Sequence, residues 1–212
     1  MRIIDQIRKE AKKFFVSAQG SHDWGHAERV CALCMRIGKR EKADLEILKL
    51  ASVLHDIGRE EETKSKGKVC HAERSAALAR EILEKLSFEK NEIDKVIHCI
   101  ETHRFRGKER PKSKEAKVLF DADKLDSIGA VGIGRAFLFA GEIGATLHNK
   151  RADVLKTDGY SKEDTAYREF MVKLRRVKSK MLTKTGRKLA SQRHQFMADF
   201  FKRLDQEVEG IL

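Results

Sequence analysis

The chain has 212 residues, of which 41% are hydrophobic and 37% charged, and Lys and Arg outnumber Asp and Glu by 45 to 33, a net charge of +12. This composition is too apolar for a disordered chain, and a single proline favours long helices over an all-β sandwich. The positive charge favours anionic partners, among which nucleotides, nucleic acids and acidic membrane surfaces all qualify.

The sequence also bears on location. The longest nearly uncharged stretch, residues 127–141, is interrupted by Arg135 and is too short to span a membrane. The N-terminus carries Asp5 and has no apolar segment typical of a signal peptide. Four cysteines in such a chain indicate reduced thiols, so we expect a cytoplasmic protein.

Apolar residues three and four positions apart predict helices along the first half of the chain. These stripes fall within residues 2–17, 30–37, 47–54, 72–86 and 93–100. Asp23 and Asp44 are expected to cap the second and third helices. The charged stretch 59–68 is expected to form a loop.

The second half follows the same period. After a loop at 104–112 with five positive charges, Ser113 is expected to cap a helix that runs towards Leu125. The glycine-rich segment 128–144 is expected to be a helix whose glycines allow close helix contact. An irregular stretch precedes a capping box that starts at Ser161 and opens another helix. The last helix is long, with a predicted apolar face at Leu189, Phe196, Phe200, Leu204 and Val208.

No alternating strand pattern of useful length interrupts this series. We therefore predict an all-α fold, formed by a single compact helical bundle over residues 1–212. Its core is expected at about residues 20–147, with residues 148–212 as additional C-terminal helices.

Histidines and aspartates gather at the predicted helix ends. His26 opens the second helix, His55 and Asp56 close the third, and Asp121, Asp123 and Asp126 close the helix after Ser113. Neutral imidazole and carboxylate are the ligand mix that Mn, Fe, Co, Ni, Zn or Mg accepts. Neighbouring residues lie about 100° apart around a helix axis, so His55 and Asp56 can both reach one ion. A lone His-Asp pair usually marks a surface pair or a cap, and only the joint pattern favours a metal site.

The ordered motifs HAERV from residue 26, LHDIG from residue 54 and DADKLD from residue 121 resemble the HD-domain superfamily of metal-dependent phosphohydrolases. The resemblance covers at least residues 21–144. In addition, residues 121–137 and 181–209 resemble a subgroup of small bacterial and archaeal HD hydrolases. It implies an HD-type bundle in which His26, His55, Asp56 and Asp123 hold a divalent ion. Asp123 is selected because the family's last ligand stands in an Ala-Asp-Lys/Arg-Leu context.

The resemblance implies hydrolysis of a phosphate ester or anhydride of a small metabolite, with a nucleotide as the expected substrate. Pyrophosphohydrolase, nucleotidase and phosphodiesterase activities all lie within the family's range. Some members place a catalytic glutamate three residues after the His-Asp pair, where this chain has Arg59. We therefore take Asp126 as the candidate general acid, with Lys124 and Arg59 as further catalytic candidates. Candidate substrate-binding residues share a positive charge or a second histidine motif, and are Lys124, Arg135, Arg29, His71 and His103.

His71 and His103 stand in the contexts HAERSA and IETH, which resemble those of two extra histidines in dinuclear HD enzymes. They imply either a second ion that shares Asp56 or binding of the substrate phosphate, and the phosphate role is the preferred expectation.

Two other functions stay open at this stage. The first is a nucleotide- or nucleic-acid-binding regulatory module on an HD scaffold, and the second is a purely structural bundle. The basic stretch 173–188 holds eight positive residues and no acid, yet it lacks interleaved aromatics, so a solvated face is favoured over nucleic-acid binding. Cys31 and Cys34 form a C-x-x-C in mid-helix, which favours buried thiols over a redox motif.

Overall fold

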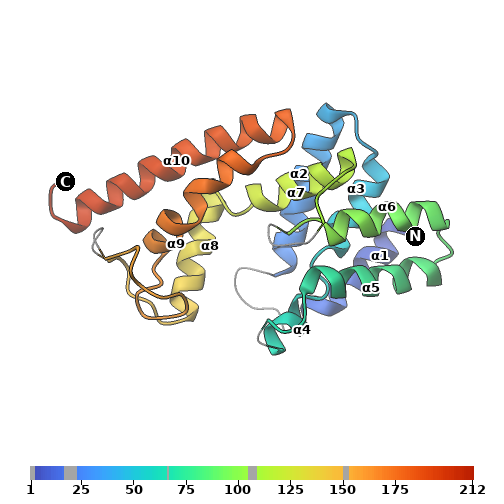
Figure 1. Ribbon diagram of the computed structural model, residues 1–212, viewed down its shortest axis with the longest axis horizontal. Helices are drawn as coiled ribbons and strands as arrows, with labels where there is room; N and C mark the ends of the chain where they lie inside the picture. The colour runs from blue at the N-terminus through green and yellow to red at the C-terminus, as the bar shows by residue number, and fades with distance from the viewer. Residues whose placement is uncertain (1–2, 17–22, 66, 105–108, 150–152) are drawn as a thin grey trace. The chain divides into compact units, whose positions relative to one another are not determined.

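The computed structural model describes residues 3–16, 23–65, 67–104, 109–149 and 153–212, and its regular structure within these ranges is helical, without a strand (Figure 1). The predicted all-α class is confirmed. None of the helices within these ranges has the length and apolar character that crossing a membrane requires. The helices are α1 (Ile3–Lys12), η1 (Lys13–Phe15), α2 (Trp24–Glu41), α3 (Leu45–Leu54), α4 (Arg59–Lys64), α5 (His71–Lys85), α6 (Lys90–Glu101), α7 (Lys114–Leu125), α8 (Gly129–Glu142), α9 (Ala166–Val172), η3 (Leu174–Lys180) and α10 (Lys184–Val208).

The chain divides into two compact units, Met1–Asp123 and Lys124–Leu212, with the boundary near the end of α7. The single domain with a core at about 20–147 stays a prediction.

In the first unit, α2 packs on α3, α3 contacts α6, and α5 pairs with α6. The three predicted caps in this unit are confirmed. The side chain of Asp23 accepts the amide of His26 at 2.9 Å, that of Asp44 accepts the amide of Glu46 at 2.9 Å, and that of Ser113 accepts the amide of Ala116 at 3.0 Å. These caps fix where α2, α3 and α7 begin, because each satisfies an amide that has no partner within its helix.

The second unit packs α10 against α8, and α9 against α8 and η3. The glycine-rich segment is helical, as predicted. A Cβ on Gly132 would lie 2.3 Å from the carbonyl oxygen of Ser127, whereas Gly134 and Gly141 have open space at that position. Of these three glycines, only Gly132 is required by a close backbone contact.

Three expectations about elements are wrong. Residues 59–64 form α4 rather than a loop, because three glutamates in its first turn favour the helix dipole and Glu60 pairs with Lys64 at 2.6 Å. The capping box at Ser161 opens no helix. Thr165 caps α9 instead, and the Asp164 carboxylate accepts from the Tyr160 amide and from Arg168, both at 2.7 Å.

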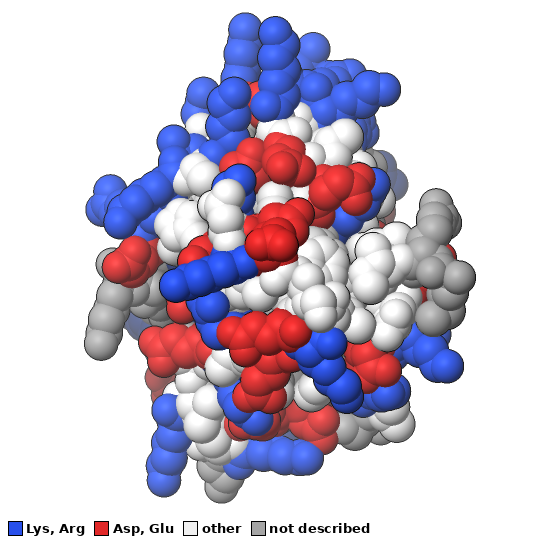
Figure 2. Space-filling model, turned by 90° about the vertical axis from the view of Figure 1, so that its right-hand side faces the viewer, with Lys and Arg blue, Asp and Glu red and all other residues white. Residues whose placement is uncertain are grey.

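The third error concerns the face of α10. Phe196 is 55% exposed and Val208 49% exposed, whereas Ala190, Met197 and Phe201 are at most 1% exposed. Leu189 is buried as predicted, but the buried residues that follow lie one residue, about 100°, around the helix from the rest of the predicted stripe. Figure 2 shows one face of the molecule. Lys and Arg side chains gather at its upper end, and below this end Asp and Glu side chains are mixed with other Lys and Arg side chains.

Candidate metal centre

Six imidazole and carboxylate side chains of the unit Met1–Asp123 converge in two groups, each with ligand atoms within 4.8 Å of one another. Each of them lies within two residues of a helix end. The first group is His26, His55 and Asp123, and the second is Asp56, His71 and His103.

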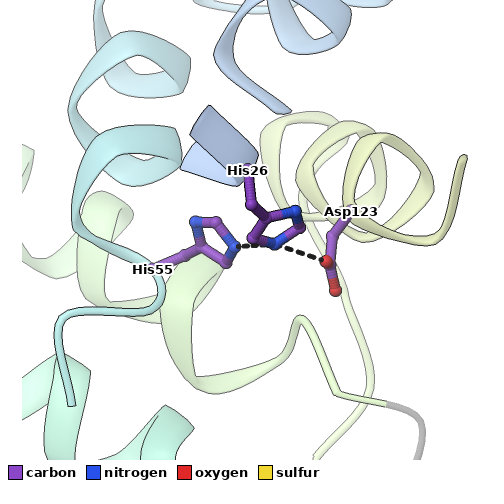
Figure 3. Close-up of side chains that lie close together, drawn as sticks. All are labelled: His26, His55 and Asp123. Atoms are coloured by element: carbon purple, nitrogen blue, oxygen red, sulfur yellow. Dashed lines mark hydrogen bonds and ion pairs between the residues drawn. The ribbon is translucent and has the colours of Figure 1, made fainter. Parts of the chain in front are cut away.

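The first group is shown in Figure 3. The Nε2 atom of His26 lies 3.3 Å from Nε2 of His55 and 3.4 Å from Oδ1 of Asp123. Both histidines are fully buried, whereas 15% of the Asp123 side chain is exposed. An ion held here would be reached by water or substrate from the Asp123 side.

The second group is equally tight. The Nε2 atoms of His71 and His103 lie 3.1 Å apart, and they lie 3.4 Å and 3.7 Å from Oδ1 of Asp56. All three residues are at most 3% exposed. Two imidazole nitrogens and a carboxylate oxygen therefore face one small volume.

Asp56 connects the two groups. Its Oδ2 atom lies 3.7 Å from Nε2 of His26 and 3.9 Å from Nε2 of His55, while its Oδ1 atom faces His71 and His103. A carboxylate with one oxygen towards each group has the disposition of a bridging ligand.

The outer nitrogens of two histidines, His55 and His103, show what their inner nitrogens offer. Nδ1 of His55 lies 2.7 Å from the Ser52 carbonyl oxygen, and Nδ1 of His103 lies 2.5 Å from the Ile100 carbonyl oxygen. A carbonyl only accepts, so both Nδ1 atoms carry the proton and Nε2 of each neutral ring is a lone-pair donor. Opposed lone pairs repel one another and are satisfied by a cation, so the donor set fits a metal ion.

Burial favours this neutral form. It lowers the pKa of His55 from 6.5 to about 4, although the neighbouring Asp56 carboxylate acts in the opposite direction. It also lowers the pKa of His71, to about 3, again against the pull of Asp56. Near neutral pH both rings are uncharged, as metal ligation requires.

Arg59 lies beside this cluster. Its guanidinium approaches Oδ2 of Asp56 at 3.5 Å and donates to Oε2 of Glu62 at 2.8 Å. Burial opposes its charge, but Asp56 and Glu62 together raise the pKa of Arg59 above its ordinary value. Arg59 is thus a fixed positive charge next to the connecting carboxylate.

The other predicted residues are not among the six converging side chains. Asp126 and Arg135 form an ion pair of 2.8 Å within the unit Lys124–Leu212, to which Lys124 also belongs. Arg29 is half-buried on α2, one turn beyond His26. The catalytic and substrate-binding roles of these residues stay predictions. The basic loop 104–112 lies partly outside the described residues.

Glu62 is the residue that sequence reasoning did not assign. Its Oε2 atom accepts from Nδ1 of His71 at 2.7 Å. Burial opposes ionisation of Glu62, yet His71, Arg59 and Arg104 lower the pKa of its carboxyl below the ordinary value. The sequence does contain an acidic run at residues 60–62. Because residues 59–68 were interpreted as a loop, no orientation could be predicted for these side chains.

Neither cysteine of the motif is among the six converging side chains. Cys34 is buried on α2, where burial raises the pKa of its thiol well above the ordinary value, and the four cysteines are free. The expectation of buried thiols is confirmed for Cys34, while Cys31 is half-buried.

A comparison with known proteins matches the stretch of chain that carries these side chains. A protein-family model described as HD domain matches residues 23–128, the stretch that contains all six converging side chains. The Bacillus subtilis (strain 168) protein YpgQ is 37% identical over 214 residues, covering 98% of this chain and 94% of its own.

Solved structures match along nearly the whole chain. The crystal structure of Bacillus subtilis YpgQ in complex with ADP has a TM-score of 0.76 and 36% identity, over 99% of this chain and 100% of that one. An HD-superfamily hydrolase from Bacillus thuringiensis has a TM-score of 0.74 and 25% identity, over 97% and 96%. A predicted HD superfamily hydrolase from an uncultured Thermotogales bacterium has a TM-score of 0.66 and 30% identity, over 98% and 92%.

Proposed function

Because the chain belongs to the HD-domain superfamily and is a metal-dependent phosphohydrolase, we propose that it hydrolyses a phosphate ester or anhydride of a nucleotide with two divalent ions at the converging side chains. The observation that carries the two-ion arrangement is Asp56, whose two carboxylate oxygens face different groups of histidines.

Each ion would have its own donors. His26, His55 and Asp123, with Oδ2 of Asp56, would hold the first ion, and His71 and His103, with Oδ1 of Asp56, the second. Mn, Fe, Co, Ni, Zn and Mg all accept this mixture of imidazole and carboxylate.

We prefer a second ion over phosphate binding by His71 and His103. A phosphate oxygen needs hydrogen-bond donors, but the Nδ1 protons of these rings point to Glu62 and to the Ile100 carbonyl. The Nε2 atoms then present lone pairs, which suit a cation and repel a phosphate oxygen. This reverses the preference drawn from the sequence.

The chemistry follows from the donors. A divalent ion held by these residues would lower the pKa of a coordinated water and polarise a phosphoryl oxygen. Asp56 orients the site by facing both groups, and the exposed edge of Asp123 leaves an approach for substrate. Arg59 contributes a positive charge beside Asp56, where it can donate to a phosphoryl oxygen as negative charge spreads over the phosphate.

Two observations support a nucleotide substrate. YpgQ, which matches along nearly the whole chain, was crystallised with ADP, and the net charge of +12 attracts polyanions. The four free cysteines fit a reducing compartment, so we place the activity in the cytoplasm.

The test is a panel of nucleotides and phosphorylated metabolites assayed for phosphate or pyrophosphate release with Mn, Co, Ni, Mg and Zn. Asp56→Ala should lower release by more than about 100-fold, because it removes a ligand from both groups. Loss of a residue that only supports a ligand costs up to about 100-fold. Asp94→Ala is the matched control, since Asp94 pairs with Arg80 on the surface of the same unit. Bound metal, measured by mass spectrometry, should fall only in the Asp56 variant.

Two results would contradict the proposal. Unchanged hydrolysis in Asp56→Ala would reject the site. Absence of turnover with every ion, combined with nucleic-acid binding in EDTA that weakens steeply with salt, would favour a regulatory binding module instead.

A further inference from the structure

We propose that Glu62 is a positioning residue for the half of the centre formed by Asp56, His71 and His103, and that its carboxylate fixes the ring of His71 so that Nε2 faces the second ion. This inference rests on the proposed function, because it concerns the ion that His71 would help to hold.

The position of His71 in its helix creates the need for Glu62. His55 and His103 each donate Nδ1–H to a carbonyl three residues earlier, those of Ser52 and Ile100, which the preceding helical turn supplies. His71 is the first residue of α5, so no earlier turn of its own helix exists to offer a carbonyl. A side chain from another element must take that place, and Glu62 of α4 does so at 2.7 Å.

The carboxylate is itself held from two sides. Oε2 of Glu62 accepts from Nη1 of Arg59 at 2.8 Å, and Oε1 accepts from Nη1 of Arg104 at 3.0 Å. Only 14% of the Glu62 side chain is exposed, so the geometry is shielded from water. Arg104 directly follows His103, and Glu62 therefore connects α4, the start of α5 and the segment after α6.

A charged acceptor also changes the ligand. A carboxylate on the outer nitrogen fixes the tautomer and raises the basicity of the inner nitrogen more than a backbone carbonyl does. Loss of Glu62 should therefore weaken the second ion selectively, and leave the first ion, held through His26, His55 and Asp123, unchanged.

The experiment measures Mn²⁺ binding to the full chain by calorimetry and by metal content after dialysis. Glu62→Gln and Glu62→Ala should weaken one of two bound ions about 10- to 100-fold, the range for outer-shell partners, with the other unchanged. Glu61→Gln is the matched control, because Glu61 is the neighbouring residue on α4 and pairs with Arg74 at 2.8 Å, away from the histidines. It should leave both ions unchanged.

A double variant separates positioning from general support of the fold. In a His71→Ala background, Glu62→Ala should cause no additional loss of the second ion, since the ring that it orients is gone. Imidazole nitrogen shifts in the metal-free protein should show Nδ1–H on His71 in the parent chain and a mixed tautomer in Glu62→Ala.

Three results would overturn the inference. Two ions bound as tightly in Glu62→Ala as in the parent chain would leave the proposed function standing and remove the role of Glu62. Equal weakening of both ions, or an additive effect with His71→Ala, would mean that Glu62 supports the fold of α4. A parent chain that binds a single ion would refute the two-ion proposal itself, before any variant is made.

Discussion

At the scale of single residues, the centre places four histidine rings around one carboxylate. His26, His55, His71 and His103 are buried, and each has Nε2 within 4 Å of an oxygen of Asp56. Burial lowers the pKa of His55 and His71 and so disfavours a second proton on these two rings, which means that acid acts against both the fold and metal binding.

The first prediction concerns pH. The pKa values of His55 and His71 are about 4 and about 3 in the folded chain, against 6.5 for an ordinary histidine. Between these pKa values the unfolded chain binds more protons than the folded chain. The contribution of these rings to the free energy of unfolding is therefore complete above about pH 6.5 and decreases as the pH falls towards 4. Urea unfolding in a chelator should show a loss of order 1 kcal/mol or more between about pH 7 and pH 5.

A variant isolates the source of this loss. His55→Gln removes one of the two titrating rings, so its stability should change less over the same pH interval. Equal pH dependence in both chains would show that the loss arises elsewhere.

Much of the residue-scale site follows from sequence. His26, His55, Asp56 and Asp123 were selected from three motifs, and the structure brings all four together with His71 and His103. Glu62 was not predicted, because a residue that hydrogen-bonds to a metal ligand rather than to the ion follows no ligand spacing in the sequence. Its role depends on His71 being the first residue of α5, a fact of three-dimensional arrangement.

At the scale of elements, the turn after Asp56 is packed tightly against the start of α5. A Cβ on Gly58 would lie 2.7 Å from the amide nitrogen of Ser75 and 2.9 Å from the carbonyl oxygen of His71. The Gly58 amide also donates to Oγ of Ser75 at 2.9 Å. This contact sets the distance between the elements that carry Asp56 and His71.

The second prediction follows from this contact. Gly58→Ala should destabilise the protein by about 1–3 kcal/mol, because the atoms that it meets are backbone and cannot rotate away. It should also lower metal affinity by displacing α5. Gly134→Ala is the contrast, since Gly134 is exposed on α8 with open space at its Cβ position, and it should stabilise by about 0.5–1 kcal/mol. Denaturant midpoints and metal titration measure both effects.

The third prediction tests the corrected face of α10. Phe201 is 1% exposed and stacks on Phe170 at 4.7 Å, whereas Phe196 is 55% exposed. Phe201→Ala should cost about 3–5 kcal/mol, and Phe196→Ala less than about 0.5 kcal/mol. A larger cost for Phe196→Ala than for Phe201→Ala, measured by urea unfolding, would favour the face predicted from sequence.

The elements that were predicted wrongly share a cause. Apolar periodicity identifies long helices that bury a face, which is why α2, α3, α5 and α6 agree with prediction. α4 has no buried residue, and local ion pairs and the helix dipole stabilise it. The start of α9 depends on Asp164 binding Arg168 rather than acting as a cap, a choice that spacing does not encode.

At the scale of the whole molecule, all six candidate ligands lie in the unit Met1–Asp123. Ligand binding to the folded state stabilises it by about 2.7 kcal/mol when the ion is at 100 times its dissociation constant. A fourth prediction is that Mn²⁺ raises the melting temperature of this unit by roughly 5–10 °C over the chelated protein. In calorimetry, any separate transition of the unit Lys124–Leu212 should stay in place, and a shift of that transition alone would contradict the site.

The donors are spread over almost a hundred positions of the chain, and Asp123 is the last of them. During synthesis, a nascent chain that ends before Asp123 lacks one member of the group formed by His26, His55 and Asp123. Domains generally fold as units while translation proceeds from the N-terminus. An ion bound as we propose would therefore reach its full affinity only after Asp123 has been synthesised.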